Sequence, residues 1–168
     1  LEITPRVLVC VNLLDEAAKK GIGLRLELLA TRLGVPVVGV VARDKGSLEN
    51  MKGALNDLCL GPDPVPIRIP YPPEMEAAVE KLTAGGLTRF QALKLLEGEP
   101  SLLRELGLWE KRVPVRDFVL DQATIQDSLA STPVLLAEKL CQGVVTYGAG
   151  KNGSRDRQAD RILTGKYT

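Results

Sequence analysis

Continuous apolar runs and amphipathic stretches alternate over the first third of the chain. Residues 6–12 and residues 35–41 are rich in β-branched side chains and show no polar alternation, a pattern typical of strands buried on both faces. The stretch 16–32 between them has a helical pattern interrupted by two glycines, and Gly34 fits its C-terminal end. A second helix is predicted from about Ser47. This strand–helix–strand–helix order predicts a parallel sheet with right-handed crossovers.

Helical patterns dominate after residue 62, where prolines at positions 62, 64, 70, 72 and 73 punctuate the chain. A short strand is predicted at residues 65–69. Thr88 and Gln91 have the spacing of a capping box, which predicts a helix starting between them. A further helix is predicted over 132–144, with a proline at its first position, and a last one over 154–163.

The chain therefore divides near residue 62. We expect an α/β part over residues 1–62, which holds a partial parallel sheet, followed by an all-α part over residues 63–168. A total of 168 residues suits one compact domain or two small ones.

Composition and charge exclude several kinds of partner. A net charge of +1 and 4% aromatic residues provide neither a basic field nor a stacking surface, so no nucleic-acid partner is expected. No apolar run approaches the roughly 20 residues of a membrane span, so the chain as given is expected to be soluble. The cysteines at positions 10, 59 and 141 form no CxxC pair, and the chain has no histidine. We expect reduced, mostly buried thiols and no metal site.

The tetrapeptide Asn12-Leu13-Leu14-Asp15 carries the most chemical information. It follows the first predicted strand, at the end where open parallel sheets bind ligands. It resembles the NKxD motif with which P-loop GTPases recognise guanine. Asp15 would accept from guanine N1–H and the exocyclic amine, Asn12 would approach N7, and Leu13 would cover the base face in place of the usual lysine. Taken alone, Asn and Asp after a strand are also common turn and helix-capping residues.

A second loop ends the next predicted strand. Val41-Ala42-Arg43-Asp44-Lys45-Gly46 resembles the (S/T)SAxxG loop of GTPases, in which the backbone N–H of the alanine donates to guanine O6. Ala42 matches that loop, and Val41 stands where serine is usual. The two loops together predict a guanine-base pocket, with no catalytic residue in this chain.

Three ordered blocks resemble the ferrous iron transport protein B family. They are the stretch from Asn12 through Leu-Gly-Val-Pro-Val-Val at 33–38, the stretch Arg-Phe-Gln-Ala-Leu-Lys-Leu-Leu-Glu at 89–97, and residues 155–164. The resemblance implies the end of a GTPase domain followed by a helical regulatory domain, on the cytoplasmic face of the inner membrane. It also implies GTP-dependent ferrous iron transport by the longer protein.

The chain departs from a GTPase in lacking the phosphate-binding motifs. No GxxxxGK[ST] or DxxG is present, and Gly148-Ala-Gly-Lys-Asn-Gly-Ser154 fails the P-loop spacing. We therefore expect a truncated or split form. Its partners would be the missing N-terminal GTPase half and the transmembrane domain. GTP or GDP with Mg²⁺ would bind the longer protein, and no cofactor is expected on this chain, which should not hydrolyse GTP alone.

Two surface properties follow from that expectation. The strand at residues 6–12 would expose its edge, so the fragment should self-associate. Residues 151–168 hold five basic and two acidic side chains, as expected of a segment lying against an anionic membrane surface just before a first span. The alternative is a non-enzymatic interaction module on a degenerate GTPase scaffold, which the substitutions at Leu13 and Val41 favour.

Overall fold

The computed structural model describes residues 1–111 and 121–148. They form two compact units. The sheet unit comprises Arg6–Pro66 with the described residues from Leu140 onward, and the helical unit comprises Leu1–Pro5 with Ile67–Lys139. Each unit is described by itself.

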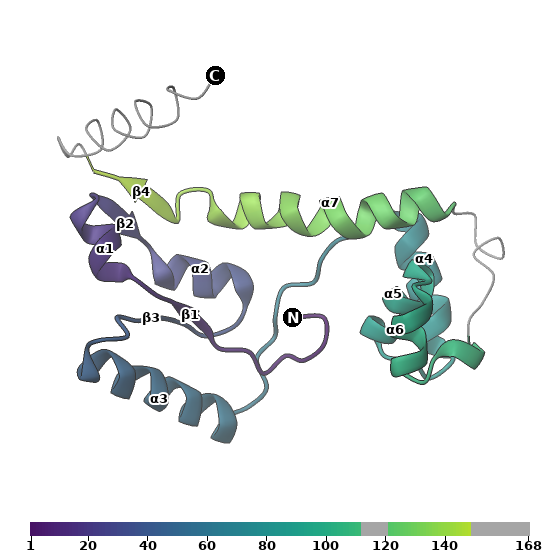
Figure 1. The fold of residues 1–168 in the computed structure, drawn as a ribbon, viewed down its shortest axis with the longest axis horizontal. Coiled ribbons are helices and arrows are strands. Elements are labelled where there is room, and N and C mark those ends of the chain that lie inside the picture. Colours follow the sequence, from purple (N-terminus) through teal and green to yellow (C-terminus); the bar gives the residue numbers. More distant parts are fainter. Residues whose placement is uncertain (112–120, 149–168) are drawn as a thin grey trace. The chain divides into compact units, whose positions relative to one another are not determined.

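The sheet unit is built on two parallel strands, as the sequence predicts. β1 (Val9–Val11) pairs with β3 (Val37–Gly39), with Cys10 opposite Val38. Helices α2 (Leu26–Leu33) and α3 (Lys45–Leu60) both contact β3, and Figure 1 shows them on opposite sides of the strand pair. The strands point their carboxyl ends, and the loops that follow them, to the same edge.

The predicted helix over 16–32 is instead two helices with a strand between them. α1 (Leu14–Lys19) stops before Gly21, whose φ of +69° lies in the left-handed region that favours glycine. The chain then forms β2 (Ile22–Leu24), which pairs antiparallel with β4 (Val145–Tyr147) near the other end of the sequence. Both strands have three residues, so the pairing depends on a partner that local periodicity does not reveal.

Helix α3 begins two residues before the predicted Ser47. The side chain of Asp44 accepts hydrogen bonds from the backbone N–H groups of Gly46 at 3.2 Å and Ser47 at 3.1 Å, and is therefore the N-cap. At the end of α2, Gly34 has the predicted left-handed C-cap conformation.

The sheet unit has a sparse core. Among the described residues of this unit, the buried apolar side chains are those of Val35, Val40, Leu58 and Val144. The prediction that β1 is buried on both faces is wrong, because Cys10 is exposed and its neighbours in the strand are half-buried. All three cysteines are free and exposed, which also corrects the prediction of buried thiols.

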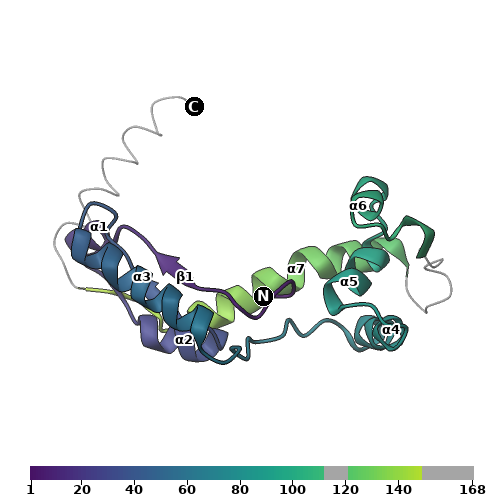
Figure 2. The ribbon, with the colours of Figure 1, turned by 90° about the horizontal axis from the view of Figure 1, so that it is seen from below.

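The helical unit has a larger core. It contains α4 (Pro73–Ala84), α5 (Arg89–Glu97), α6 (Pro100–Glu105), the 3-10 turn Trp109–Lys111, and α7, whose full span is Gln122–Cys141. Figures 1 and 2 both show α4, α5 and α6 gathered beside the N-terminal half of α7. Met75, Leu96, Leu103 and Ile125 are almost completely buried between these elements.

Two predictions for this part need correction and one is confirmed. Residues 65–69 form no strand, and α7 starts ten residues before the predicted position, so that Pro133 lies inside the helix. Burial of Ile125 and Leu129 extends the helix toward its N-terminus, and this packing outweighs the local preference for proline at a helix start. The capping box of Thr88 and Gln91 is present with both of its hydrogen bonds.

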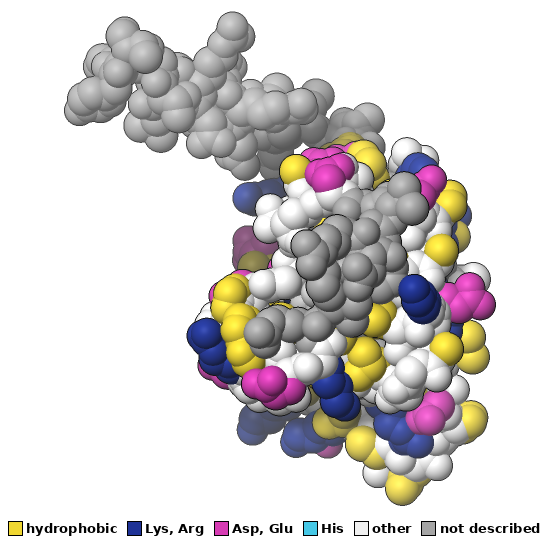
Figure 3. Space-filling model, turned by 90° about the vertical axis from the view of Figure 1, so that its right-hand side faces the viewer, with side chains coloured by type: hydrophobic (Ala, Val, Ile, Leu, Met, Phe, Trp, Pro, Cys, Tyr) yellow, Lys and Arg dark blue, Asp and Glu magenta, His cyan; other side chains and the backbone are white. Residues whose placement is uncertain are grey.

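The predicted fold class is confirmed at this level: a small parallel sheet with helices comes first and a helical part follows. The predicted all-α character of residues 63–168 is wrong at β4, because the chain from Leu140 onward returns to the sheet unit and pairs with β2. The predicted helix over 154–163 and the basic segment 151–168 lie outside the described residues. None of the helices within residues 1–111 and 121–148 combines the length and the apolar character of a membrane span. On the face in Figure 3, acidic and basic side chains are interspersed among apolar ones.

Candidate functional site

The two predicted guanine loops lie side by side in the sheet unit. Asn12 directly follows β1, and Val40 and Val41 directly follow β3. A hydrogen bond from Val40 N–H to the Val11 carbonyl oxygen, at 2.8 Å, extends the parallel ladder to the base of both loops. The structure thus brings the five predicted site residues to one edge of the sheet.

The first loop turns sharply before α1. Leu13 is the one non-glycine residue with positive φ in the described part of the chain, at φ 62° and ψ 32°. Its N–H donates to Asn12 Oδ1 at 2.8 Å, and its side chain points into solvent with 61% of the residue exposed. This conformation costs an L-residue roughly 1–2 kcal/mol. An exposed, strained apolar residue at a loop tip is more typical of a binding surface than of a packing position.

Close packing beneath this loop depends on Gly39 at the end of β3. A Cβ atom built there would lie 2.9 Å from Leu26 Cδ1 and still closer to Leu14 Cδ1. Glycine therefore lets the first turn of α1, which carries Asp15, lie directly against the strand end.

In the second loop, one backbone N–H is already occupied and its neighbour is open. Val41 N–H donates to Ser47 Oγ at 2.8 Å, and Asp44 N–H donates to the Val41 carbonyl oxygen at 2.8 Å. Ala42 N–H has no hydrogen-bond partner among the described residues. The loop is therefore held by Ser47 and Asp44 while it presents the Ala42 donor, which is the group predicted to bind guanine O6.

Asp15 is not free. Its carboxylate forms an ion pair with the guanidinium of Arg43 across the two loops, and Glu16 Oε1 lies 3.7 Å from the same guanidinium nitrogen. Sequence reasoning assigned no role at the site to Arg43 or Asp44, and it placed Ser47 only at the start of a helix. The signal for the last two is the Asp-x-x-Ser spacing before a helix, whereas the contact of Arg43 with Asp15 joins residues 28 positions apart and has no sequence signature.

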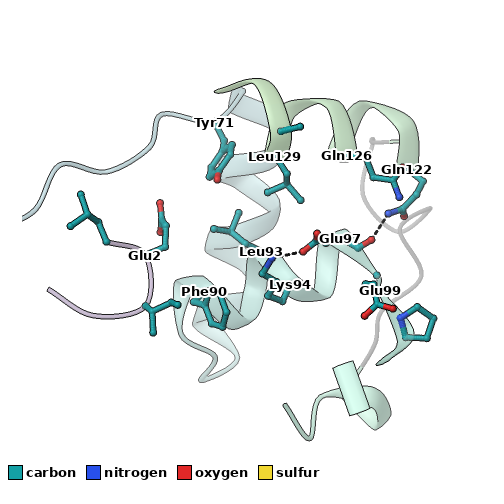
Figure 4. A pocket seen from close by; sticks show the side chains of 15 residues that line it. Glu2, Tyr71, Phe90, Leu93, Lys94, Glu97, Glu99, Gln122, Gln126 and Leu129 are labelled. Carbon is teal, nitrogen blue, oxygen red and sulfur yellow. Dashed lines mark hydrogen bonds and ion pairs between the residues drawn. The ribbon is translucent and has the colours of Figure 1, made fainter. Parts of the chain in front are cut away.

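The helical unit contains a separate concave site. A cavity of about 730 Å³ has Leu93 and Leu129 among its apolar lining and Lys94, Glu97 and Gln122 among its polar lining. Figure 4 shows how these side chains surround it. Lys94 Nζ lies 2.6 Å from Glu97 Oε2, and Gln122 donates to the Glu97 carbonyl oxygen at 2.6 Å. These polar groups pair with one another.

A charged network beside this cavity holds the N-terminal residues to the helical unit. Arg89 donates to both carboxylate oxygens of Glu76 at 2.7 Å, to Glu2 at 3.0 Å and to the Ile69 carbonyl oxygen at 3.0 Å. The hydrogen bonds that Glu76 accepts from Arg89 lower the pKa of Glu76 and raise the pKa of Arg89. Burial raises the pKa of Tyr71, over whose ring the guanidinium lies. This arrangement is structural, because it pairs the charge of Arg89 with those of Glu2 and Glu76; within it, Glu2 Oε1 has no hydrogen-bond partner among the described residues.

No group of three or more potential metal-ligating side chains occurs within residues 1–111 and 121–148. The guanine loops therefore remain the candidate site with a defined chemistry.

Known proteins resemble the chain over nearly its whole length. Residues 1–55 match the sequence model of the family described as Ferrous iron transport protein B. The Fe(2+) transporter FeoB of Staphylococcus aureus strain COL is 26% identical over 181 aligned residues, which cover 99% of this chain and 27% of that protein. A fusion of Fe(2+) transport protein A with Fe(2+) transporter FeoB, from Porphyromonas gingivalis strain W83, is 33% identical over 129 residues, which cover 68% of this chain and 15% of that protein.

The fold also matches solved structures. The cytosolic domain of the T. maritima FeoB iron transporter in its GMPPNP form aligns with a TM-score of 0.72 and 20% identity, covering 86% of this chain and 59% of that one. The GDP form I of the same domain aligns with a TM-score of 0.69.

These similarities define the fold class: the sheet unit has the fold of part of a P-loop NTPase-like G-domain, and a helical unit accompanies it. Within that class, the predicted resemblance is confirmed, and the chain belongs to the ferrous iron transport protein B family. The chain spans 27% of the Staphylococcus aureus relative and 59% of the T. maritima cytosolic domain.

Proposed function

We propose that this chain supplies the guanine-recognition loops and the helical regulatory domain of a GTP-dependent ferrous iron transporter. The observation that carries the proposal is the placement of Asp15, in the first turn of α1, beside the loop of Ala42, each just past the end of one of two paired parallel strands. Asp15 would accept from the N1–H and amine of guanine, and the open Ala42 N–H would donate to O6. The solved relatives in GMPPNP and GDP forms support a nucleotide role for the longer protein.

The residues present indicate which role each part of the chain would have. The sheet unit would provide base recognition, with Asn12, Leu13 and Val41 completing the pocket, and the helical unit would serve as the regulatory domain. Phosphate and Mg²⁺ binding would come from the missing N-terminal GTPase half, because the sequence contains no P-loop. This chain would therefore not hydrolyse GTP alone, since phosphoryl transfer depends on positioning and charge stabilisation at the phosphates.

The proposed location is the cytoplasmic face of the membrane that holds the longer protein. The solved relatives are described as cytosolic domains of FeoB. The basic segment 151–168 would lie toward the inner leaflet, where Lys and Arg flank a first span.

Nucleotide titration followed by amide NMR shifts tests the proposal on the chain as it exists. Base contacts without phosphate contacts should give affinities no tighter than roughly millimolar, or about 4 kcal/mol. GMP should shift the amides of Asn12 and Ala42, whereas AMP, which has no adjacent N1–H and amine donors, should not. Equal responses to the two nucleotides, or shifts confined to the helical unit, would reject guanine recognition.

A second function is favoured by one observation. The carboxylate predicted to read the base is already paired with Arg43, as it would be in a scaffold that binds no nucleotide. Such a non-enzymatic interaction module would use the exposed Leu13 surface to contact another protein. The same titration separates the two functions, because the module predicts no guanine-selective shift at any accessible concentration.

A further inference from the structure

The ion pair between Arg43 and Asp15 joins the two guanine loops. Arg43 directly follows Ala42, and its side chain is 70% exposed, whereas that of Asp15 is 23% exposed. The guanidinium thus reaches from solvent onto a largely covered carboxylate. Glu16, with its carboxylate oxygen 3.7 Å away, adds a second acidic group to the place where the cation lies.

Guanidinium and guanine present the same donors to a carboxylate. Each has adjacent N–H groups on an N–C–N unit, which in guanine are N1–H and the exocyclic amine. A carboxylate accepts either arrangement well, but the two planar groups cannot occupy the same side of Asp15 together. We propose that Arg43 is an internal competitor for guanine, which occupies Asp15 when no nucleotide is present and must leave when the base binds. This inference rests on the proposed role of Asp15 in guanine recognition.

The position of Arg43 makes such an exchange feasible. It lies in the loop between β3 and α3, beside the anchored Asp44, so its long side chain can move while the loop backbone keeps its place. In the exchange Asp15 would pass from its one described donor, Arg43 Nη2, to the two donors of guanine, and Arg43 would gain hydration and retain Glu16 as a nearby charge. No buried group is left unpaired at either stage.

The strength of the competition follows from the exposure of the pair. An ion pair with an exposed partner such as Arg43 contributes little free energy. The usual contribution of such a pair corresponds to a change of about two- to five-fold in an equilibrium constant. Arg43 would therefore tune guanine affinity within about that factor and would not close the site.

Amide-shift titrations with GMP test the role of Arg43. Arg43→Ala should tighten GMP binding about two- to five-fold and leave the response to AMP unchanged, whereas Arg43→Lys, which keeps the charge but loses the planar donor pair, should fall between. Lys45→Ala is the matched control, because it removes a cation two positions further on that makes no described ion pair with Asp15. It should leave GMP binding as in the unaltered chain.

The outcomes distinguish the competitor role of Arg43 from guanine recognition itself. Unchanged or weaker GMP binding in Arg43→Ala, with guanine selectivity retained, would overturn the competitor role while guanine recognition stands. Equal tightening in Lys45→Ala would also overturn it, because general charge removal would then explain the effect. Absence of guanine-selective shifts in both the unaltered chain and Arg43→Ala would overturn the competitor role together with the proposed function.

Discussion

Replacing Arg89 with methionine should strongly destabilise the helical unit at neutral pH. The Arg89 side chain is 15% exposed and pairs with Glu2, itself 17% exposed, and with Glu76, which is 38% exposed. In Arg89→Met both carboxylates lose their cation. Glu2 is affected most, because its Oε1 atom already has no hydrogen-bond partner among the described residues. Breaking a buried pair costs roughly 3–5 kcal/mol. Because Glu76 is partly solvated, we expect about 3 kcal/mol.

The cost should depend on pH in a defined direction. Arg89 lowers the pKa of Glu76, so the folded carboxyl binds its proton less readily than the unfolded one. The stabilisation is fully present above the ordinary glutamate pKa of about 4.3 and is lost as pH falls through the lowered pKa of the folded state. The difference between Arg89→Met and the unaltered chain should therefore be greatest at neutral pH and shrink in acid.

Urea unfolding followed by tryptophan fluorescence measures this cost. Trp109 is the single tryptophan of the sequence and lies in the helical unit, so its signal reports that unit. Arg89→Lys is the matched variant, because it keeps the charge but cannot donate to both oxygens of Glu76 in the same planar geometry, and it should cost less. A loss below about 1 kcal/mol for Arg89→Met at neutral pH, or an equal loss in acid, would refute the reasoning.

Three further predictions concern the sheet unit and the C-terminal segment. Leu13→Asn should raise the stability of the sheet unit by up to about 1 kcal/mol, because asparagine tolerates positive φ; hydrogen exchange measures this, with Leu13→Ala as the control that should bring no gain. The chain should self-associate through the free edge of β1, and Cys10→Pro, which removes an N–H pointing away from β3, should restore the monomer. A monomer in light scattering before any substitution would contradict that prediction. Residues 151–168 should bind anionic vesicles weakly at low salt and release them at high salt; binding that survives high salt would exclude an electrostatic cause.

Local chemistry made part of the fold predictable. The runs of β-branched residues around Val9 and Val37 indicate paired parallel strands because a helix-containing connection joins them. The capping box at Thr88 and the left-handed end at Gly34 were predicted because both depend only on neighbouring residues. The sequence alone likewise predicts that the loops after these strands lie at one edge of the sheet.

Features that depend on distant partners were missed. β2 is a strand because it pairs with β4, where Gly23 lies opposite Thr146, 123 positions further along the chain. α7 continues through Pro133 because residues nearer its start are buried. Full burial of β1 was predicted from its apolar pattern, yet side-chain burial requires covering elements, and the described residues leave Cys10 exposed. The same limit applies to Arg43, whose partner is fixed by the fold alone.

The most direct test of guanine recognition is an exchange of base preference in Asp15→Asn. Xanthine carries a carbonyl where guanine has its amine, so an asparagine amide can donate to it and still accept from N1–H, whereas guanine would meet a donor with its own donor. Amide-shift titrations of both forms with GMP and XMP measure this preference. We predict that the unaltered chain prefers GMP and that Asp15→Asn prefers XMP. An unchanged preference for GMP in Asp15→Asn would contradict the central claim and remove Asp15 from the site.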